Sequence, residues 1–423
     1  MKKPTLIIGL FLYSIMLGDN CAADAISAQL QQLQTQIKQL QTEIKSVNPT
    51  VAGSVQVNAN APLGEFSSAF SLLQTQDQYS APITLGAEFS AAVQTWGGSH
   101  LSGVLGRRGE YSISGSAIAL TTADLDVLAN INAWTQAFIT IQGGLNGYST
   151  MLSQAFLNFG DLNKSPFYAT VGDTTLPFGS FQGGGPLTET LAANAFASTD
   201  LSQIDLGYST NNLNSELALF NGQNNFNNFV LSSQYQTTSS VFIWGIGASY
   251  MNDIRYAGND IAAAYGTSNG TYNNRTEILQ GGANGVVDFN SNMAYNFTSS
   301  RSLFGAAEWS STTGSATVRE TGDANGRMQA WTLTGGYSLP VMNKSTTFAV
   351  NYSATTNMPD VPLQLPGAIN KTTLSIIGVK NQWLGYFNTE IFNNIYIGPE
   401  LAWLKLYNGE HTWESALVIN AYL

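Results

Sequence analysis

The feature that most constrains this chain is a period of two in its hydrophobicity, which begins at Thr50. In residues 123–131, the odd positions are Ala, Leu, Val, Ala and Ile, whereas the even positions include two Asp and one Asn. Successive side chains of a β-strand point to opposite faces, so the pattern predicts strands with one apolar and one polar face. Segments such as 285–298 and 329–340 are long enough to cross a bilayer at a tilt, which takes about 9–11 residues. Strands of a soluble β-sandwich run to about 5–6 residues, so the pattern favours a membrane-embedded β-barrel.

The composition agrees with this choice. Charged residues make up 10 % of the chain, whereas soluble domains carry about 25 %. A transmembrane helix needs about 20 consecutive apolar residues, and the longest apolar run, Thr5 to Gly18, is too short. The 21 Phe, 18 Tyr and 8 Trp argue against a disordered chain. We therefore predict an all-β transmembrane fold.

The alternating segments give roughly 16 to 18 candidate strands, and single-chain bacterial barrels use even numbers, so we predict 16. The candidates are 50–61, 82–96, 109–120, 122–133, 134–143, 153–160, 165–173, 202–209, 214–221, 228–237, 241–251, 285–298, 301–311, 329–340, 346–355, 373–391, 393–407 and 412–423. Longer connections are expected on the cell exterior, at 61–81, 174–201, 252–284, 312–328 and 356–372. The last strand is expected to pair with the strand near Val51, because an open edge leaves backbone groups unbonded in lipid.

The N-terminus, residues 1–23, has the pattern of an export signal. Lys2 and Lys3 precede the apolar run, and Ala22-Ala23 offers a small-residue cleavage site before Asp24. Lipidation at Cys21 is the alternative, and the polar residues directly before it argue against it. Cleavage after Ala23 removes the only Cys, which suits an oxidising export route to the bacterial outer membrane.

Residues 24–48 carry a different pattern, in which apolar residues are spaced alternately four and three apart. This heptad seam consists of Ile26, Leu30, Leu33, Ile37, Leu40, Ile44 and Val47. Asn48-Pro49 ends the helix. A helix of about three heptads is marginal alone, so we expect a periplasmic coiled coil with neighbouring subunits, giving a homotrimer. An amphipathic helix lying on its own barrel is the alternative. The barrel domain then spans residues 49–423.

Acidic residues at lumen-facing positions are the candidate functional residues. By the alternation, these pore-lining candidates are Glu88, Asp124, Asp126, Asp205 and Glu308. Rings of carboxylates favour cations, although a water-filled lumen also tolerates single charges that have no function. Arg107-Arg108 either balances these acids or lies in a turn.

Catalysis is not expected, and neither is binding of a cofactor, a metal ion or nucleic acid. His100 and His411 are the only histidines and fall on separate predicted loops, so no Ser–His–Asp triad is indicated. The glycine run 183–185 lacks the Lys-Ser/Thr of a phosphate-binding loop. Asp253, Asn259 and Asp260 lack calcium-loop spacing and suggest a solvated external loop. A net charge of −11 without basic clusters disfavours nucleic acid.

One segment carries a family resemblance. Residues 167–181 contain Val171-Gly172 and then Leu176-Pro177-Phe178-Gly179. This segment, with the order of signal, coiled coil and barrel, resembles the LbtU-type siderophore porins of Gram-negative bacteria. The resemblance implies a barrel of about 16 strands without an N-terminal plug, taking up a ferric siderophore or iron. It implies no ligand residues for this chain.

Three functions remain open at this stage. The first is a channel for a siderophore or iron, which rests on the resemblance. The second is a general diffusion porin for small polar solutes, which rests on composition. The third is a structural or tethering outer-membrane protein that binds partners through its coiled coil. In all three, membrane lipid surrounds the barrel.

Overall fold

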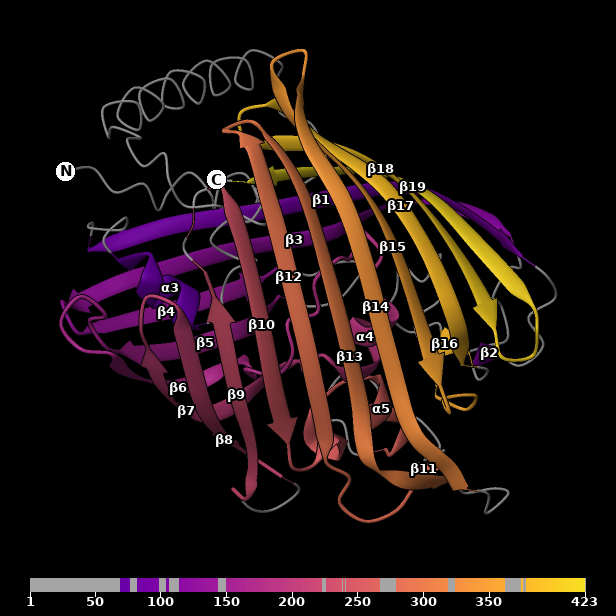
Figure 1. The fold of residues 1–423 in the computed structure, drawn as a ribbon, viewed down its shortest axis with the longest axis horizontal. Coiled ribbons are helices and arrows are strands. Elements are labelled where there is room, and N and C mark those ends of the chain that lie inside the picture. The colour runs from indigo at the N-terminus through magenta and orange to yellow at the C-terminus, as the bar shows by residue number, and fades with distance from the viewer. Residues whose placement is uncertain are drawn as a thin grey trace, which may run out of the picture. The chain divides into compact units, whose positions relative to one another are not determined.

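A computed structural model gives the fold of the chain (Figure 1). It describes residues 69–76, 82–98, 104–105, 114–143, 150–222, 226–237, 239, 241–266, 279–318, 324–361, 374–375 and 378–422. The predicted signal, the coiled-coil seam and the candidate strand 50–61 lie outside the described residues and stay predictions. Arg107-Arg108 and His100 also lie outside them.

Sixteen antiparallel strands close into a barrel, which confirms the predicted fold. They are β1 (Ile83–Gly98), β3 (Gly115–Asn132), β4 (Thr135–Gln142), β5 (Met151–Phe159), β6 (Phe167–Thr175), β7 (Asp200–Ser209), β8 (Leu213–Phe220), β9 (Asn228–Gln236), β10 (Phe242–Met251), β12 (Val286–Thr298), β13 (Arg301–Val318), β14 (Ala324–Val341), β15 (Lys344–Thr356), β17 (Val379–Phe392), β18 (Ile395–Leu406) and β19 (His411–Tyr422). The short β11 (Leu279–Gln280) pairs with β13, and β2 (Val104–Leu105) pairs with β16 (Leu374–Ser375).

Two details of the predicted strand order are wrong. Candidates 109–120 and 122–133 are one strand, β3, whose register against β1 shifts between Leu120 and Thr122. The extra residue is Thr121, and such a bulge breaks the alternation, so one strand has the pattern of two. The last strand, β19, closes the barrel on β1 and not on a segment near Val51, because β18 and β1 occupy both of its edges.

The outer face of the wall is apolar and carries two rows of aromatic side chains. One row lies near the barrel end at which longer connections join the strands, called the long-loop side. It includes Phe289, Trp309, Trp331, Trp383, Trp403 and Trp413. The row on the short-turn side includes Phe242, Tyr295, Tyr337, Phe348 and Phe387. Phe289 and Tyr295 are six residues apart on β12, which is about 20 Å along a strand. This spacing fits the apolar band, about 25 Å tall, that outer-membrane barrels present to lipid between aromatic girdles.

Short turns join the strands at one rim, and longer connections join them at the other. The predicted facing is confirmed in β14, where Trp331 is 38 % exposed on the outside and Thr332 is 2 % exposed on the inside. In bacterial outer-membrane barrels, the rim with short turns faces the periplasm.

Helices lie inside the barrel as well. They are α3 (Ala69–Gln74) before β1, α4 (Leu191–Phe196) between β6 and β7, and η2 (Ile254–Tyr256) with α5 (Asp260–Ala264) after β10. Figure 1 shows α4 and α5 behind β13 and β14, and α4 contacts both strands. The expectation that connections 61–81, 174–201 and 252–284 are external loops is therefore wrong for these helical parts. No helix in the described part of the chain is long and apolar enough to cross a membrane.

Candidate functional site

The connection between β6 and β7, residues 176–199, folds into the lumen and is called the lumenal loop below. It begins at the Leu176-Pro177-Phe178-Gly179 segment, where the Phe178 N–H donates to the Leu176 carbonyl at 2.8 Å. Gly179 has a φ of 70° and donates its N–H to Ser249 Oγ on β10 at 3.0 Å. Leu176 and Phe178 are both 3 % exposed. The segment that carried the family resemblance is thus the entry of the lumenal loop.

Two carboxylates of the barrel wall bind the backbone of the lumenal loop. Glu308 Oε1 on β13 accepts hydrogen bonds from the N–H groups of Ser180 at 2.8 Å and Phe181 at 3.0 Å. Glu400 Oε2 on β18 accepts from the N–H groups of Leu187 at 3.0 Å and Thr188 at 3.3 Å. Each carboxyl group accepts two backbone hydrogen bonds, so these four contacts hold the loop against the wall.

Between the two anchors, the lumenal loop lies close to the wall because it is rich in glycine. Gly183 has a φ of 101°, and a Cβ there would overlap Thr334 Oγ1 on β14. A Cβ at Gly185 would overlap the carboxylate of Glu400. The glycine run noted in the sequence is therefore a site of close backbone approach.

The loop then turns back along the same wall. Gln382 on β17 donates to the Glu189 carbonyl at 3.2 Å, and the Leu191 N–H donates to Ser353 Oγ on β15 at 3.2 Å. Helix α4 begins here, with the Thr190 hydroxyl accepting from the Ala193 N–H. The lumenal loop thus follows the inner wall from β10 to β18 and returns, narrowing the lumen from that side.

An apolar core fixes this arrangement from the long-loop side. Leu191 and Phe196 of α4 and Ile261 of α5 are fully buried against inward residues of the wall. Asp253 and Asn259 cap η2 and α5, with exposures of 4 % and 5 %. The sequence-based expectation of a solvated loop at these residues is therefore wrong, because their side chains satisfy buried helix ends.

All the predicted pore-lining acids take lumen-facing positions. Glu88 and Asp124 are directly opposite each other on β1 and β3. Asp126 is 1 % exposed and accepts from the Thr140 hydroxyl at 2.6 Å. Asp205 is 4 % exposed and lies next to Glu216. The structure therefore does not gather the candidates into one cluster: Glu308 anchors the lumenal loop, and the others lie on β1, β3 and β7.

Sequence reasoning missed further acids on the same face, although the alternation of their strands contains the signal. These acids are Glu216, Asp288, Glu390, Glu400 and Glu414. Basic residues are placed differently. None of the described Lys and Arg residues takes a lumen-facing position on the wall; they lie in connections, at strand ends or on the outer face, at Lys164, Arg255, Arg301, Arg327, Lys344, Lys380 and Lys405. The inner wall, over the described strands, is therefore acidic.

His411 begins β19, where its ring stacks on Trp403 at 4.7 Å, so its expected place in a loop is wrong. Within the described segments, no group of three or more His, Cys, Asp and Glu side chains is placed to hold a metal ion.

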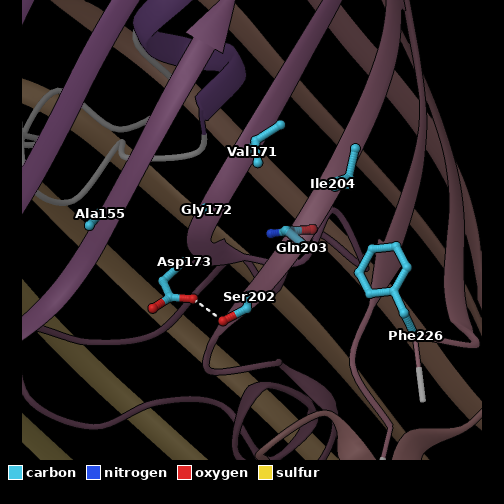
Figure 2. A pocket seen from close by; sticks show the side chains of 8 residues that line it. All are labelled: Ala155, Val171, Gly172, Asp173, Ser202, Gln203, Ile204 and Phe226. Atoms are coloured by element: carbon cyan, nitrogen blue, oxygen red, sulfur yellow. Dashed lines mark hydrogen bonds between the residues drawn. The ribbon is translucent and has the colours of Figure 1, made fainter.

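Two pockets lie on the outer face of the described strands, away from the lumen. One, of about 740 Å³, is lined by outward side chains such as Ile246, Phe289 and Leu333. The other, of about 240 Å³, lies over β5 to β7 between Val171, Ile204 and Phe226. Figure 2 shows Asp173 accepting a hydrogen bond from Ser202 at its edge. Neither pocket belongs to a path through the barrel.

The closed wall of 16 antiparallel strands is a porin-like fold. The chain belongs to the family described as "Protein of unknown function (DUF3573)", whose model matches residues 48–276. The "UPF0422 protein" of Coxiella burnetii (strain RSA 493 / Nine Mile phase I) is 26 % identical over 156 residues, covering 35 % of this chain and 31 % of that protein. The chain thus matches about a third of that relative's length.

Solved outer-membrane proteins are similar in fold. OprB of Pseudomonas putida matches 84 % of this chain and 97 % of its own, at 10 % identity and a TM-score of 0.51. The outer membrane channel DcaP of Acinetobacter baumannii matches 81 % of this chain and 97 % of its own, at 10 % identity and a TM-score of 0.49. At this level of identity, the similarity extends to the fold alone.

Proposed function

We propose that the protein is a passive outer-membrane channel for small polar solutes, with a preference for neutral and cationic ones. The observation that carries the proposal is the lumenal loop, held on the inner wall by Glu308 and Glu400. A loop fixed in this way narrows a barrel to a defined passage while leaving the rest of the cross-section to water. The inner face of the barrel is polar and the outer face is apolar, which is the arrangement of a water-filled channel in a membrane.

The charge of the inner wall supports the preference for cations. Carboxyl groups face the lumen on β1 and β3 at Glu88, Asp124 and Asp126. Acidic rings favour cations in pores. One pair of unit charges 4 Å apart is worth about 1 kcal/mol in bulk water, and salt weakens it. Dispersed acids therefore bias a wide passage without closing it to anions.

Iron uptake is the narrower form of this proposal. The resemblance to LbtU-type porins implies a ferric siderophore as the solute. A ferric complex of a carboxylate siderophore is anionic, and the acidic wall repels it. Ferrous ion or a cationic chelate suits the same wall, so we propose that any iron passes in a cationic form. A tethering role through the predicted coiled coil is the alternative that needs no passage.

Solute flux into liposomes tests the proposal. Purified protein in liposomes should admit small neutral sugars, and should admit a small organic cation faster than an anion of equal size. The matched control is the same preparation after heat unfolding. Absence of flux for every solute would contradict the channel and favour the tethering role. Growth of a deletion strain on ferrous iron and on a ferric siderophore then separates iron uptake from general diffusion.

A further inference from the structure

A second element, α3, lies inside the barrel on the side opposite the lumenal loop. Figure 1 shows this helix beside β4 and β5. Its residues Ala69, Leu72 and Leu73 are 7 %, 3 % and 2 % exposed. The neighbouring Gln74 is exposed, so the helix has one buried face and one face toward water.

The wall beneath α3 is apolar at a place where barrel lumens are ordinarily polar. Leu128 on β3, Phe138 on β4 and Phe156 on β5 all point inward and are at most 4 % exposed. Phe138 and Phe156 also contact each other, with ring centroids 5.2 Å apart. Large apolar side chains facing a water-filled lumen are unfavourable unless something covers them. The apolar face of α3 covers this patch.

Polar and aromatic contacts hold α3 at one end of the barrel. Asn158 Nδ2 donates to the Ala69 carbonyl at 2.7 Å, and Gln76 Nε2 donates to the Ala133 carbonyl at 3.0 Å. Phe70 stacks on Tyr168 with a centroid separation of 5.3 Å. Ala133 belongs to the short β3–β4 turn, so α3 lies at the periplasmic mouth.

We propose that α3 is a displaceable gate at the periplasmic mouth, and this proposal rests on the channel function proposed above. A helix with its side chains is about 10–12 Å across, which is a large obstruction in a passage already narrowed by the lumenal loop. A six-residue helix is unstable without its packing partners. Its place therefore depends on the apolar patch and on the contacts of Asn158, Gln76 and Phe70, so weakening the packing releases it.

Single-channel recording on the full chain tests the gate. The double variant L72N/L73N makes the buried face of α3 polar, and the matched control Q74N changes its exposed face. Because an element about 10–12 Å across leaves the passage, L72N/L73N should conduct about twofold more than Q74N and the unaltered channel. Equal conductance in L72N/L73N and Q74N would overturn the gate.

Labelling gives a second readout that does not need conduction. The variant A69C, in a C21S background, places a thiol on the buried face of α3 and keeps the hydrogen bond from Asn158 to the backbone carbonyl. A water-soluble maleimide should react slowly in A69C and quickly in A69C/L72N/L73N, with the heat-modifiable gel shift confirming a folded barrel. Fast labelling with unchanged conductance, or slow labelling in both, overturns the gate. Fast labelling with no conductance in any variant means that the proposed channel function has failed as well. If L72N/L73N does not fold, the wall variant F138S, compared with lipid-facing I139S, replaces it in both measurements.

Discussion

The carboxylate of Glu308 accepts a hydrogen bond from the backbone N–H of Ser180 at 2.8 Å, although 128 residues separate them. The contact joins β13 to the lumenal loop that leaves β6. The alternation assigns Glu308 to the pore lining, and this contact makes its side chain an anchor for the lumenal loop. Glu400 on β18 does the same for Leu187, 213 residues away.

Removal of both anchors should loosen the lumenal loop. The double variant E308A/E400A loses four hydrogen bonds, worth about 0.5–1.5 kcal/mol each. We expect noisier and larger single-channel currents, since the loop then moves in the passage. E189A is the matched control, because Glu189 is exposed on the same loop. Identical currents from the double variant and E189A would show that the anchors do not position the loop.

The facing of β3 gives a prediction for stability in lipid. Val127 lies on the outer face, so V127R should destabilise the barrel by about 2–4 kcal/mol near the bilayer midplane. The control Q142R places the same side chain on the lumen side of β4, opposite Asp124, and should cost much less. Urea unfolding in lipid vesicles measures both. A larger cost for Q142R than for V127R would reverse the assigned faces.

The heptad seam at Ile26, Leu30, Leu33, Ile37, Leu40, Ile44 and Val47 stays a prediction, because it lies outside the described residues. If it holds a trimer, I37D/L40D should weaken the oligomer and leave the heat-modifiable barrel intact. The control changes two flanking glutamines, as Q36D/Q39D. Crosslinking and gel migration report the oligomer. An oligomer of unchanged strength in I37D/L40D would assign the helix to another role.

The β5–β6 turn predicts a pH effect at the periplasmic rim. A hydrogen bond from Lys164 at 2.6 Å lowers the pKa of Asp161. A carboxyl group whose pKa is lower in the folded state than in the unfolded state stabilises the fold at pH values above the unfolded-state pKa. This stabilisation is lost as the pH falls through the folded-state pKa. D161N should therefore be slightly less stable than the unaltered protein at neutral pH, and the difference should disappear only in acid below the lowered pKa of Asp161, which lies under the ordinary value of 3.8. Thermal unfolding at both pH values measures the difference, and a difference that persists in acid would contradict the assignment.

The wall could be predicted from the sequence because its signal is local. The alternation in β14 separates Trp331 from Thr332 without knowledge of any other strand. The same signal failed at Thr121, where one extra residue changes the parity of β3. It also failed for closure, because the choice of β1 as the partner of β19 depends on two strands at opposite ends of the chain.

The lumenal elements could not be predicted, because they depend on contacts between distant residues. Nothing near Gly183 in the sequence shows that Thr334 lies against it. The sequence contains one sign of the apolar patch under α3, because Leu128 is an apolar residue on the otherwise polar face of β3. Read together with Phe138 and Phe156 on the same face, it would have indicated a buried surface inside the barrel.

The reversal potential of the open channel in a KCl gradient tests the central claim most directly. One close pair of opposite charges contributes about 1 kcal/mol in water. If a cation gains this energy at the acidic wall, the cation-to-anion permeability ratio should be about five. The ratio should fall toward one in D124N/D126N and stay unchanged in D173N, whose acid lies on the outer face. Anion selectivity in the unaltered protein, or the same ratio in both variants, would contradict the account of a water-filled passage lined by these acids.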